Sequence, residues 1–129
     1  MKKILFIAMM ASVLSCKKSL SDKSSMKAVG NWELRNELCG WSGPKTYAAG
    51  NGSTITLYCD GRYQSMFQGL SFGHYVVTER LNSSQQMQRY VYFDGSWNHE
   101  YRLDIANGIM TLDNGDYISD GCEYKFERY

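Results

Sequence analysis

Apolar and polar residues alternate in short segments from residue 30 to residue 129. Eight segments show the pattern: W-E-L-R-N, T-I-T-L-Y-C, R-Y-Q-S-M-F, G-H-Y-V-V-T, M-Q-R-Y-V-Y-F, E-Y-R-L-D-I, I-M-T-L and C-E-Y-K-F-E-R-Y. Alternation with a period of two is typical of strands that bury one face. Tyr, Val, Ile, Phe and Trp, which fill these segments, favour strands, and no long helical period appears. The pattern predicts an all-β domain over residues 30–129.

Turn-forming dipeptides separate these segments. They are Asp60-Gly61, Gln68-Gly69, Asn82-Ser83, Asp94-Gly95, Asn107-Gly108 and Asn114-Gly115. Asp-Gly and Asn-Gly supply the positive φ angles that tight hairpins need. Short turns between about eight strands predict an up-and-down antiparallel meander. Because the number is even, the last strand can close on the first, which makes a small barrel and removes the exposed edges.

The alternation also predicts which side chains face the barrel interior. Counted from Trp32, the inward set is Trp32, Leu34, Ile55, Leu57, Tyr63, Phe67, Tyr75, Val77, Tyr101, Leu103, Ile105, Met110, Leu112, Tyr124 and Phe126. In the fifth segment two registers stay open, with either Tyr90 and Tyr92 or Val91 and Phe93 facing inward. The interior is either a solid core, as in many small barrels, or a pocket where a ligand meets the tyrosine hydroxyls.

The first 29 residues have a different composition. M-K-K followed by the apolar residues 4–14 is the layout of a secretory signal peptide, and this run is shorter than the roughly 20 residues that span a bilayer. Residues 17–29 are rich in Lys and Ser and read as a flexible tether. Without Lys2 and Lys3 the chain has 12 basic and 13 acidic residues, a net charge of −1, and no basic cluster. Nucleic acid is therefore not an expected partner.

The segment Val13-Leu14-Ser15-Cys16 resembles the lipobox of bacterial lipoproteins. In that family the cysteine is acylated and the signal peptide is removed just before it. The resemblance implies that residues 1–15 are a signal peptide, that Cys16 carries the lipid, and that residues 16–29 are the lipidated cysteine and its tether. Lys17 stands where an aspartate is the family's usual inner-membrane retention signal. The resemblance therefore implies a lipid-anchored protein of the outer membrane of a Gram-negative cell.

Gly30-Asn31-Trp32 resembles the G-x-W signature of lipocalins. L-Y-C-D-G-R-Y, G-H-Y-V-V and D-G-C-E-Y-K-F-E-R are similar to segments of the short lipocalin-like domains of bacterial lipoproteins. The resemblance covers residues 30–129 and implies a barrel with a cavity for small apolar or amphipathic molecules. It also implies that Trp32 stacks under an arginine near the end of the last strand, which is Arg128 in this chain.

Three cysteines follow Cys16, namely Cys39, Cys59 and Cys122. Export implies an oxidising compartment, and an odd set of three allows at most one bridge within the domain. Antiparallel closure of the barrel places the end of the first strand beside the start of the last. We therefore predict a disulfide between Cys39 and Cys122.

Residues 39–53 are the least regular part of the domain and join the first two predicted strands. Long loops in compact domains are often functional. The leading hypothesis is a small apolar or amphipathic ligand in the barrel, bound by Trp41, Tyr47, Tyr63, Tyr75, Tyr90, Tyr101 and Tyr124. The alternative is a module with a filled core that recognises a protein or glycan through its loops, with Trp41 and Trp97 as anchors.

Catalysis is not expected. His74 alternates against the inward Tyr75 and is predicted to face solvent, while His99 and Glu100 point to opposite faces of one strand. No nucleophile motif, phosphate loop or Cys-x-x-Cys pair occurs in the sequence. The sequence therefore predicts no catalytic residue, no metal site and no cofactor. The expected partners are the membrane, through the lipid, and a small hydrophobic ligand, and any protein partner is left unidentified.

Overall fold

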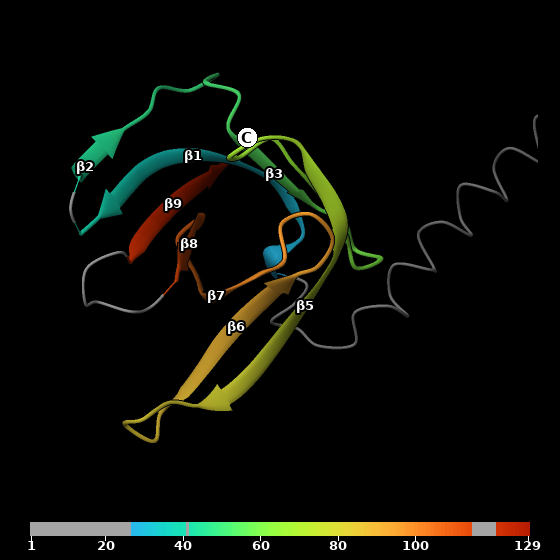
Figure 1. Ribbon diagram of the computed structural model, residues 1–129, viewed down its shortest axis with the longest axis vertical. Helices are drawn as coiled ribbons and strands as arrows, with labels where there is room; N and C mark the ends of the chain where they lie inside the picture. The colour runs from blue at the N-terminus through green and yellow to red at the C-terminus, as the bar shows by residue number, and fades with distance from the viewer. Residues whose placement is uncertain (1–26, 41, 115–120) are drawn as a thin grey trace, which may run out of the picture.

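The computed structural model describes residues 27–40, 42–114 and 121–129. They form nine strands, β1 (Gly30–Cys39), β2 (Gly43–Thr46), β3 (Thr54–Leu57), β4 (Arg62–Ser65), β5 (Ser71–Leu81), β6 (Met87–Phe93), β7 (His99–Ala106), β8 (Ile109–Asp113) and β9 (Cys122–Arg128) (Figure 1). The prediction of an all-β domain is confirmed. Within these residues, no helix has the length and apolar character needed to cross a bilayer.

Eight of these strands close into an antiparallel barrel. The sheet order is β2-β1-β3-β4-β5-β6-β7-β8-β9, and β9 pairs with β1 to complete the ring. Apart from β2, strands that follow one another in the sequence are neighbours in the sheet, which confirms the predicted up-and-down order. Closure pairs Trp32 with Arg128 at one end of the seam and Cys39 with Cys122 at the other, where a disulfide joins the two cysteines.

Strand β2 lies within residues 39–53, which were expected to form a long loop between the first two strands. It pairs with the second half of β1, Asn36–Cys39, whereas β3 pairs with the first half, Gly30–Glu33. The two short strands therefore follow one another along the same edge of β1, with residues 47–53 between them. The sequence pattern did not predict β2, because it contains Pro44 and proline cannot donate a hydrogen bond within a sheet. Proline is normally confined to edge strands, and β2 is an edge strand because it pairs with β1 alone.

The barrel has two ends that differ in structure. At the disulfide end, β1 finishes at Cys39 and β9 begins at Cys122, and the turns of residues 66–70 and 94–98 lie at the same end. At the Trp32 end, β1 begins and β9 finishes. The turns of residues 58–61, 82–86 and 107–108 belong to this second end, because all neighbouring strands are antiparallel.

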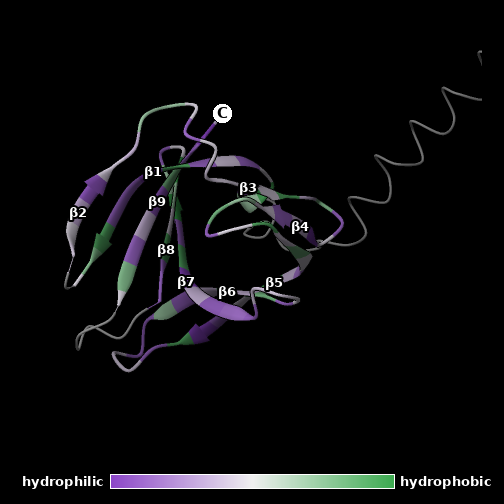
Figure 2. Cartoon of the chain, turned by 45° about the horizontal axis from the view of Figure 1, so that its top comes forward, coloured by the Kyte–Doolittle hydropathy of each residue, from purple (hydrophilic) through white to green (hydrophobic). Residues whose placement is uncertain are grey.

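The predicted inward residues form the core. All fifteen are buried except Val77 and Ile105, which are partly buried and pack against the core. In β6 the structure selects the second register, with Val91 and Phe93 buried. Tyr90 lies on the outer wall of the barrel, so its expected place in the interior is wrong. Figure 2 shows apolar and polar residues interspersed along the strands, as this one-face burial requires.

Candidate functional site

An aromatic cluster occupies the barrel interior and reaches the disulfide end. Its members are Tyr63, Phe67, Tyr75, Phe93, Trp97, Tyr101, Tyr124 and Phe126. Trp97 enters from the turn between β6 and β7 and stacks on Phe93, with ring centroids 4.2 Å apart. Phe67 enters from the turn between β4 and β5 and meets Tyr124 edge-on at 4.8 Å. Two turns of the disulfide end thus contribute aromatic rings to the cluster.

Every buried tyrosine of this cluster has a hydrogen-bond partner within the protein. Tyr63 donates to the carbonyl of Asp94 at 2.6 Å, and Tyr75 donates to the carbonyl of Tyr58 at 2.8 Å. The hydroxyl of Tyr101 accepts from Trp97 Nε1 at 3.2 Å. These bonds remove the need for a ligand to satisfy the hydroxyls.

Tyr124 completes the set, because its hydroxyl accepts from Gln68 Nε2 at 3.1 Å. Burial raises the pKa of Tyr75 and the pKa of Tyr101 to about 12. Burial also raises the pKa of Tyr63 and Tyr124. All four phenols are therefore neutral at physiological pH. Neutral, internally bonded tyrosines are the features of a packed core rather than of an acid–base site.

Tyr47, which the sequence proposed as a ligand-binding residue, packs partly buried against the core. Its hydroxyl donates to Glu37 Oε2 at 2.7 Å, and this bond raises the pKa of Tyr47. Trp41 and Cys16, also proposed from the sequence, lie outside the described residues. The structure therefore brings Tyr63, Tyr75, Tyr101 and Tyr124 together in the interior and leaves Tyr90 outside.

The segment of residues 47–53 is fastened to the barrel by a buried carboxylate. Glu33 is 5% exposed and accepts hydrogen bonds from the backbone N–H of Gly50 at 2.8 Å and of Gly52 at 3.4 Å. Its Oε1 also lies 2.6 Å from Arg35 Nη1. The hydrogen bond from Gly50, followed by that from Arg35, lowers the pKa of Glu33. Both glycines have φ of 83°, a conformation that other residues rarely adopt, so the loop depends on them.

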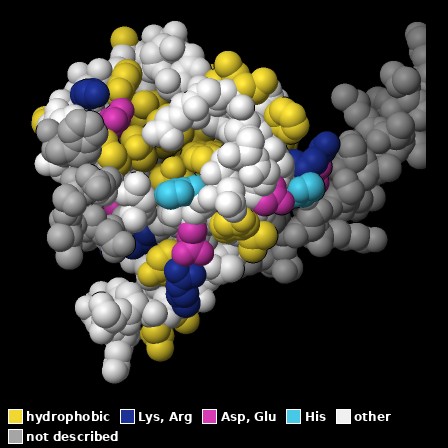
Figure 3. Space-filling view, viewed as in Figure 1, with side chains coloured by type: hydrophobic (Ala, Val, Ile, Leu, Met, Phe, Trp, Pro, Cys, Tyr) yellow, Lys and Arg dark blue, Asp and Glu magenta, His cyan; other side chains and the backbone are white. Residues whose placement is uncertain are grey.

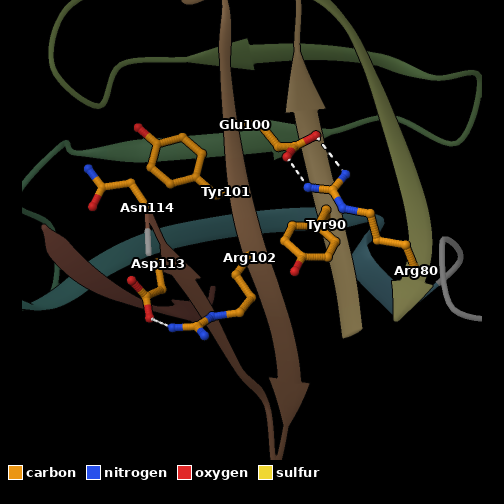
Figure 4. A pocket seen from close by; sticks show the side chains of 7 residues that line it. All are labelled: Arg80, Tyr90, Glu100, Tyr101, Arg102, Asp113 and Asn114. Atoms are coloured by element: carbon orange, nitrogen blue, oxygen red, sulfur yellow. Dashed lines mark hydrogen bonds and ion pairs between the residues drawn. The ribbon is translucent and has the colours of Figure 1, made fainter. Parts of the chain in front are cut away.

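A polar groove runs along the outer wall over β5 to β8 (Figure 4). It has a volume of about 340 Å³ and is lined by Arg80, Tyr90, Glu100, Tyr101, Arg102, Asp113 and Asn114. The guanidinium of Arg80 lies 3.6 Å from the centroid of the Tyr90 ring and reaches Glu100 with two hydrogen bonds. Arg102 pairs with Asp113. Because these charges pair with each other, the groove offers no excess charge to a ligand.

The cross-strand pair of Arg80 and Glu100 also braces β5 against β7, since it crosses over Tyr90 of the intervening strand. A second depression of about 420 Å³ adjoins the groove over β7 to β9 and shares Arg102 and Asp113 with it. On its wall, Lys125 Nζ lies 3.6 Å from Glu123 Oε1. Both depressions are open to solvent, and Tyr101 is the one member of the aromatic cluster that lines either of them.

An apolar hairpin patch, formed by Met66, Leu70 and Phe72, lies beside the disulfide end. These side chains are 50%, 59% and 67% exposed. They flank the turn between β4 and β5, and they point outward because Ser65 and Ser71, which alternate with them, are buried. Exposed apolar side chains gathered in this way mark interaction surfaces more often than isolated ones do.

The sequence contained a signal for this patch. In M-F-Q-G-L-S-F, the alternation that puts Phe67 inside puts Met66 on the opposite face, and the apolar Leu70 and Phe72 follow on that face. The patch was not predicted, because buried and exposed positions of this segment are both largely hydrophobic. Trp97, proposed as a loop anchor for a partner, is instead a member of the aromatic cluster.

Both histidines lie on the surface of the barrel. His74 is exposed, as predicted, with Nδ1 3.7 Å from Asp94 Oδ2. His99 is exposed and its ring contacts Tyr101 at 4.6 Å between centroids. Among residues 27–40, 42–114 and 121–129, no group of three or more His, Cys, Asp or Glu side chains is placed to hold a metal ion. Comparison of the chain with protein-family models, curated proteins and solved structures finds no match.

Proposed function

We propose that this chain is a non-enzymatic, lipid-anchored binding protein of the bacterial cell envelope, built on a lipocalin-like barrel with a filled core. The anchor is taken from the lipobox resemblance at Cys16, and the outer membrane from the lysine that follows it. The barrel recognises a protein partner through its outer surface at the disulfide end. This proposal follows the filled-core alternative of the sequence analysis, but it assigns the binding surface to the apolar hairpin patch instead of the loop tryptophans.

The observation that carries the proposal is the exposure of three large apolar side chains on one hairpin. Met66, Leu70 and Phe72 are each at least half exposed and lie on or beside a single turn. The interior, by contrast, satisfies its own polar groups, since the buried tyrosine hydroxyls bond within the protein. Apolar and aromatic side chains are typical of the centre of a protein–protein interface.

Site-specific photo-crosslinking in cells tests this surface. A photoreactive amino acid at position 72 should give a discrete adduct with a protein partner. The same group at position 125, on the outer face of β9, is the matched control, because Lys125 is exposed but lies away from the hairpin. Equal adducts at both positions, or none above background at position 72, would count against the proposal.

A second candidate is the binding of a small amphipathic ligand at the disulfide end. Its support is that Trp97 and Tyr47 are only partly buried and that Trp97 is carried by a turn. In the space-filling view, hydrophobic side chains are visible on this face of the molecule (Figure 3). A ligand there would replace the bond from Trp97 Nε1 to the Tyr101 hydroxyl. This candidate predicts a bound small molecule in the purified protein.

A further inference from the structure

The point at which the described chain begins is fixed to the Trp32 end of the barrel. Ala28 is fully buried, and its carbonyl accepts a hydrogen bond from Trp32 Nε1 at 2.7 Å. Arg128 donates to the carbonyl of Val29 at 2.8 Å and also to that of Lys27. Any tether that precedes Lys27 therefore leaves the barrel from this end.

The hairpin of β5 and β6 projects at the same end. Tyr75 is level with the turn between β3 and β4, because its N–H donates to the carbonyl of Gly61. Strand β5 then continues to Leu81, which at about 3.3 Å per residue adds roughly 20 Å. Figure 1 shows this hairpin extending away from the remaining strands.

The outer part of this hairpin combines apolar exposure with an absence of charge. Leu81 and Met87 are cross-strand neighbours and are 64% and 67% exposed. The sequence between and including them, L-N-S-S-Q-Q-M, has no charged residue. The turn is ordered by Asn82, whose Oδ1 accepts from the N–H of Ser84 at 2.9 Å and of Gln86 at 3.0 Å. An ordered, uncharged turn flanked by apolar side chains can enter a lipid interface without desolvating an ion.

We infer that the β5–β6 hairpin rests on the bilayer that holds the chain, with Leu81 and Met87 against the lipid. The inference depends on the proposed acylation of Cys16. Residues 17–26 separate that cysteine from Lys27, and a flexible chain of ten residues spans about 16–19 Å. The bilayer surface is therefore within reach of the Trp32 end. The disulfide end, with the apolar hairpin patch, then faces away from the membrane toward a partner.

Two native methionines provide the test. Met87 is 67% exposed on the hairpin, and Met66 is 50% exposed at the opposite end, so in free solution Met87 should be oxidised at least as fast as Met66. The acylated chain is bound to vesicles of phosphatidylethanolamine and phosphatidylglycerol and treated with hydrogen peroxide. Peptide mass spectrometry then gives the sulfoxide formed at each position. We expect Met87 to be oxidised several-fold more slowly than Met66.

Two variants sharpen the result. Ser83→Glu adds a carboxylate to the exposed turn, where an anionic surface repels it, and should restore oxidation of Met87. Ser83→Gln is the uncharged control and should leave Met87 protected. If the protein floats with the vesicles but Met87 is oxidised as fast as Met66, the proposed hairpin contact is wrong and the anchor still stands. A chain that fails to float with the vesicles would overturn both.

Discussion

The guanidinium of Arg128 lies over the indole ring of Trp32, with Cζ 4.2 Å from the ring centroid. The two residues face each other across the seam between the first and last barrel strands. Arg128 also bonds to the backbone just before β1. Gly30 makes room for it, because a Cβ at that position would lie 2.5 Å from Arg128 Nη1. One arginine therefore holds the end of β9 against the start of β1 and the residues before it.

Arg128→Ala should destabilise the fold. A cation over an aromatic face contributes about 0.5–2 kcal/mol, and charged hydrogen bonds add to it. We expect a loss of roughly 1–3 kcal/mol, measured by thermal or chemical denaturation, with about 4–8 °C in Tm for each kcal/mol. Arg62→Ala is the control, since Arg62 is an exposed residue at the start of β4 whose Cζ lies 5.8 Å from the centroid of the Tyr58 ring. Equal effects of the two substitutions would contradict a special role for Arg128.

The disulfide between Cys39 and Cys122 closes the other end of the same seam. It joins residues 83 positions apart, and removing a bridge of this kind typically costs about 2–5 kcal/mol. The double variant Cys39→Ala/Cys122→Ala should therefore unfold at a clearly lower denaturant concentration than the parent under non-reducing conditions. Peptide mapping without reduction checks the pairing itself. Recovery of Cys39 joined to Cys59 would show that this seam is wrong.

Glu33→Gln should lower stability in a pH-dependent way. The pKa of Glu33 is lowered in the folded protein, so the unfolded chain binds its proton at higher pH than the folded one. The stability that the ionised carboxylate contributes is then complete above the pKa of about 4.3 in the unfolded chain. It is lost as the pH falls through the lower pKa of the folded protein. The gap in Tm between parent and variant should be constant near neutrality and should narrow in acid. A difference in Tm that does not change with pH would show that the charge of Glu33 does not contribute to stability. Glu123→Gln serves as the control.

Cys16→Ser should abolish acylation, because the thiol is the attachment site of the first lipid in the lipoprotein family. Metabolic labelling with a tagged fatty acid measures it directly, and we expect label on the parent and none on the variant. Cys59 is not a free thiol in the structure, so the state of every cysteine should be mapped in the same experiment. Equal label on the variant, or Cys16 recovered in a disulfide, would contradict the anchor.

Much of the fold follows from local rules. Alternation and turn residues predict the eight barrel strands, and closure of an even meander predicts that Cys39 meets Cys122. Local rules did not predict which residues of β6 face the interior, because tyrosine is found on either face of a strand. Tyr90 lies outside because Arg80 covers its ring and bonds to Glu100 beyond it, and this arrangement depends on three strands at once.

The candidate site was less predictable than the fold. The buried Glu33 carboxylate accepts from two glycine N–H groups that lie 17 and 19 positions away, which no local pattern indicates. Trp97 follows a turn dipeptide and therefore looks like an exposed loop residue, yet it stacks on Phe93 in the core. The tyrosines were correctly placed inside, but their hydroxyl partners are mostly backbone carbonyls and turn residues, which the sequence does not reveal.

Native mass spectrometry of the acylated chain, released from detergent in the instrument, tests the filled barrel most directly. The packed aromatic cluster predicts that the measured mass is that of the acylated polypeptide alone, in independent preparations. A reproducible small molecule bound one to one, and lost when Trp97→Ala opens the disulfide end, would contradict the filled core and establish the barrel as a ligand carrier.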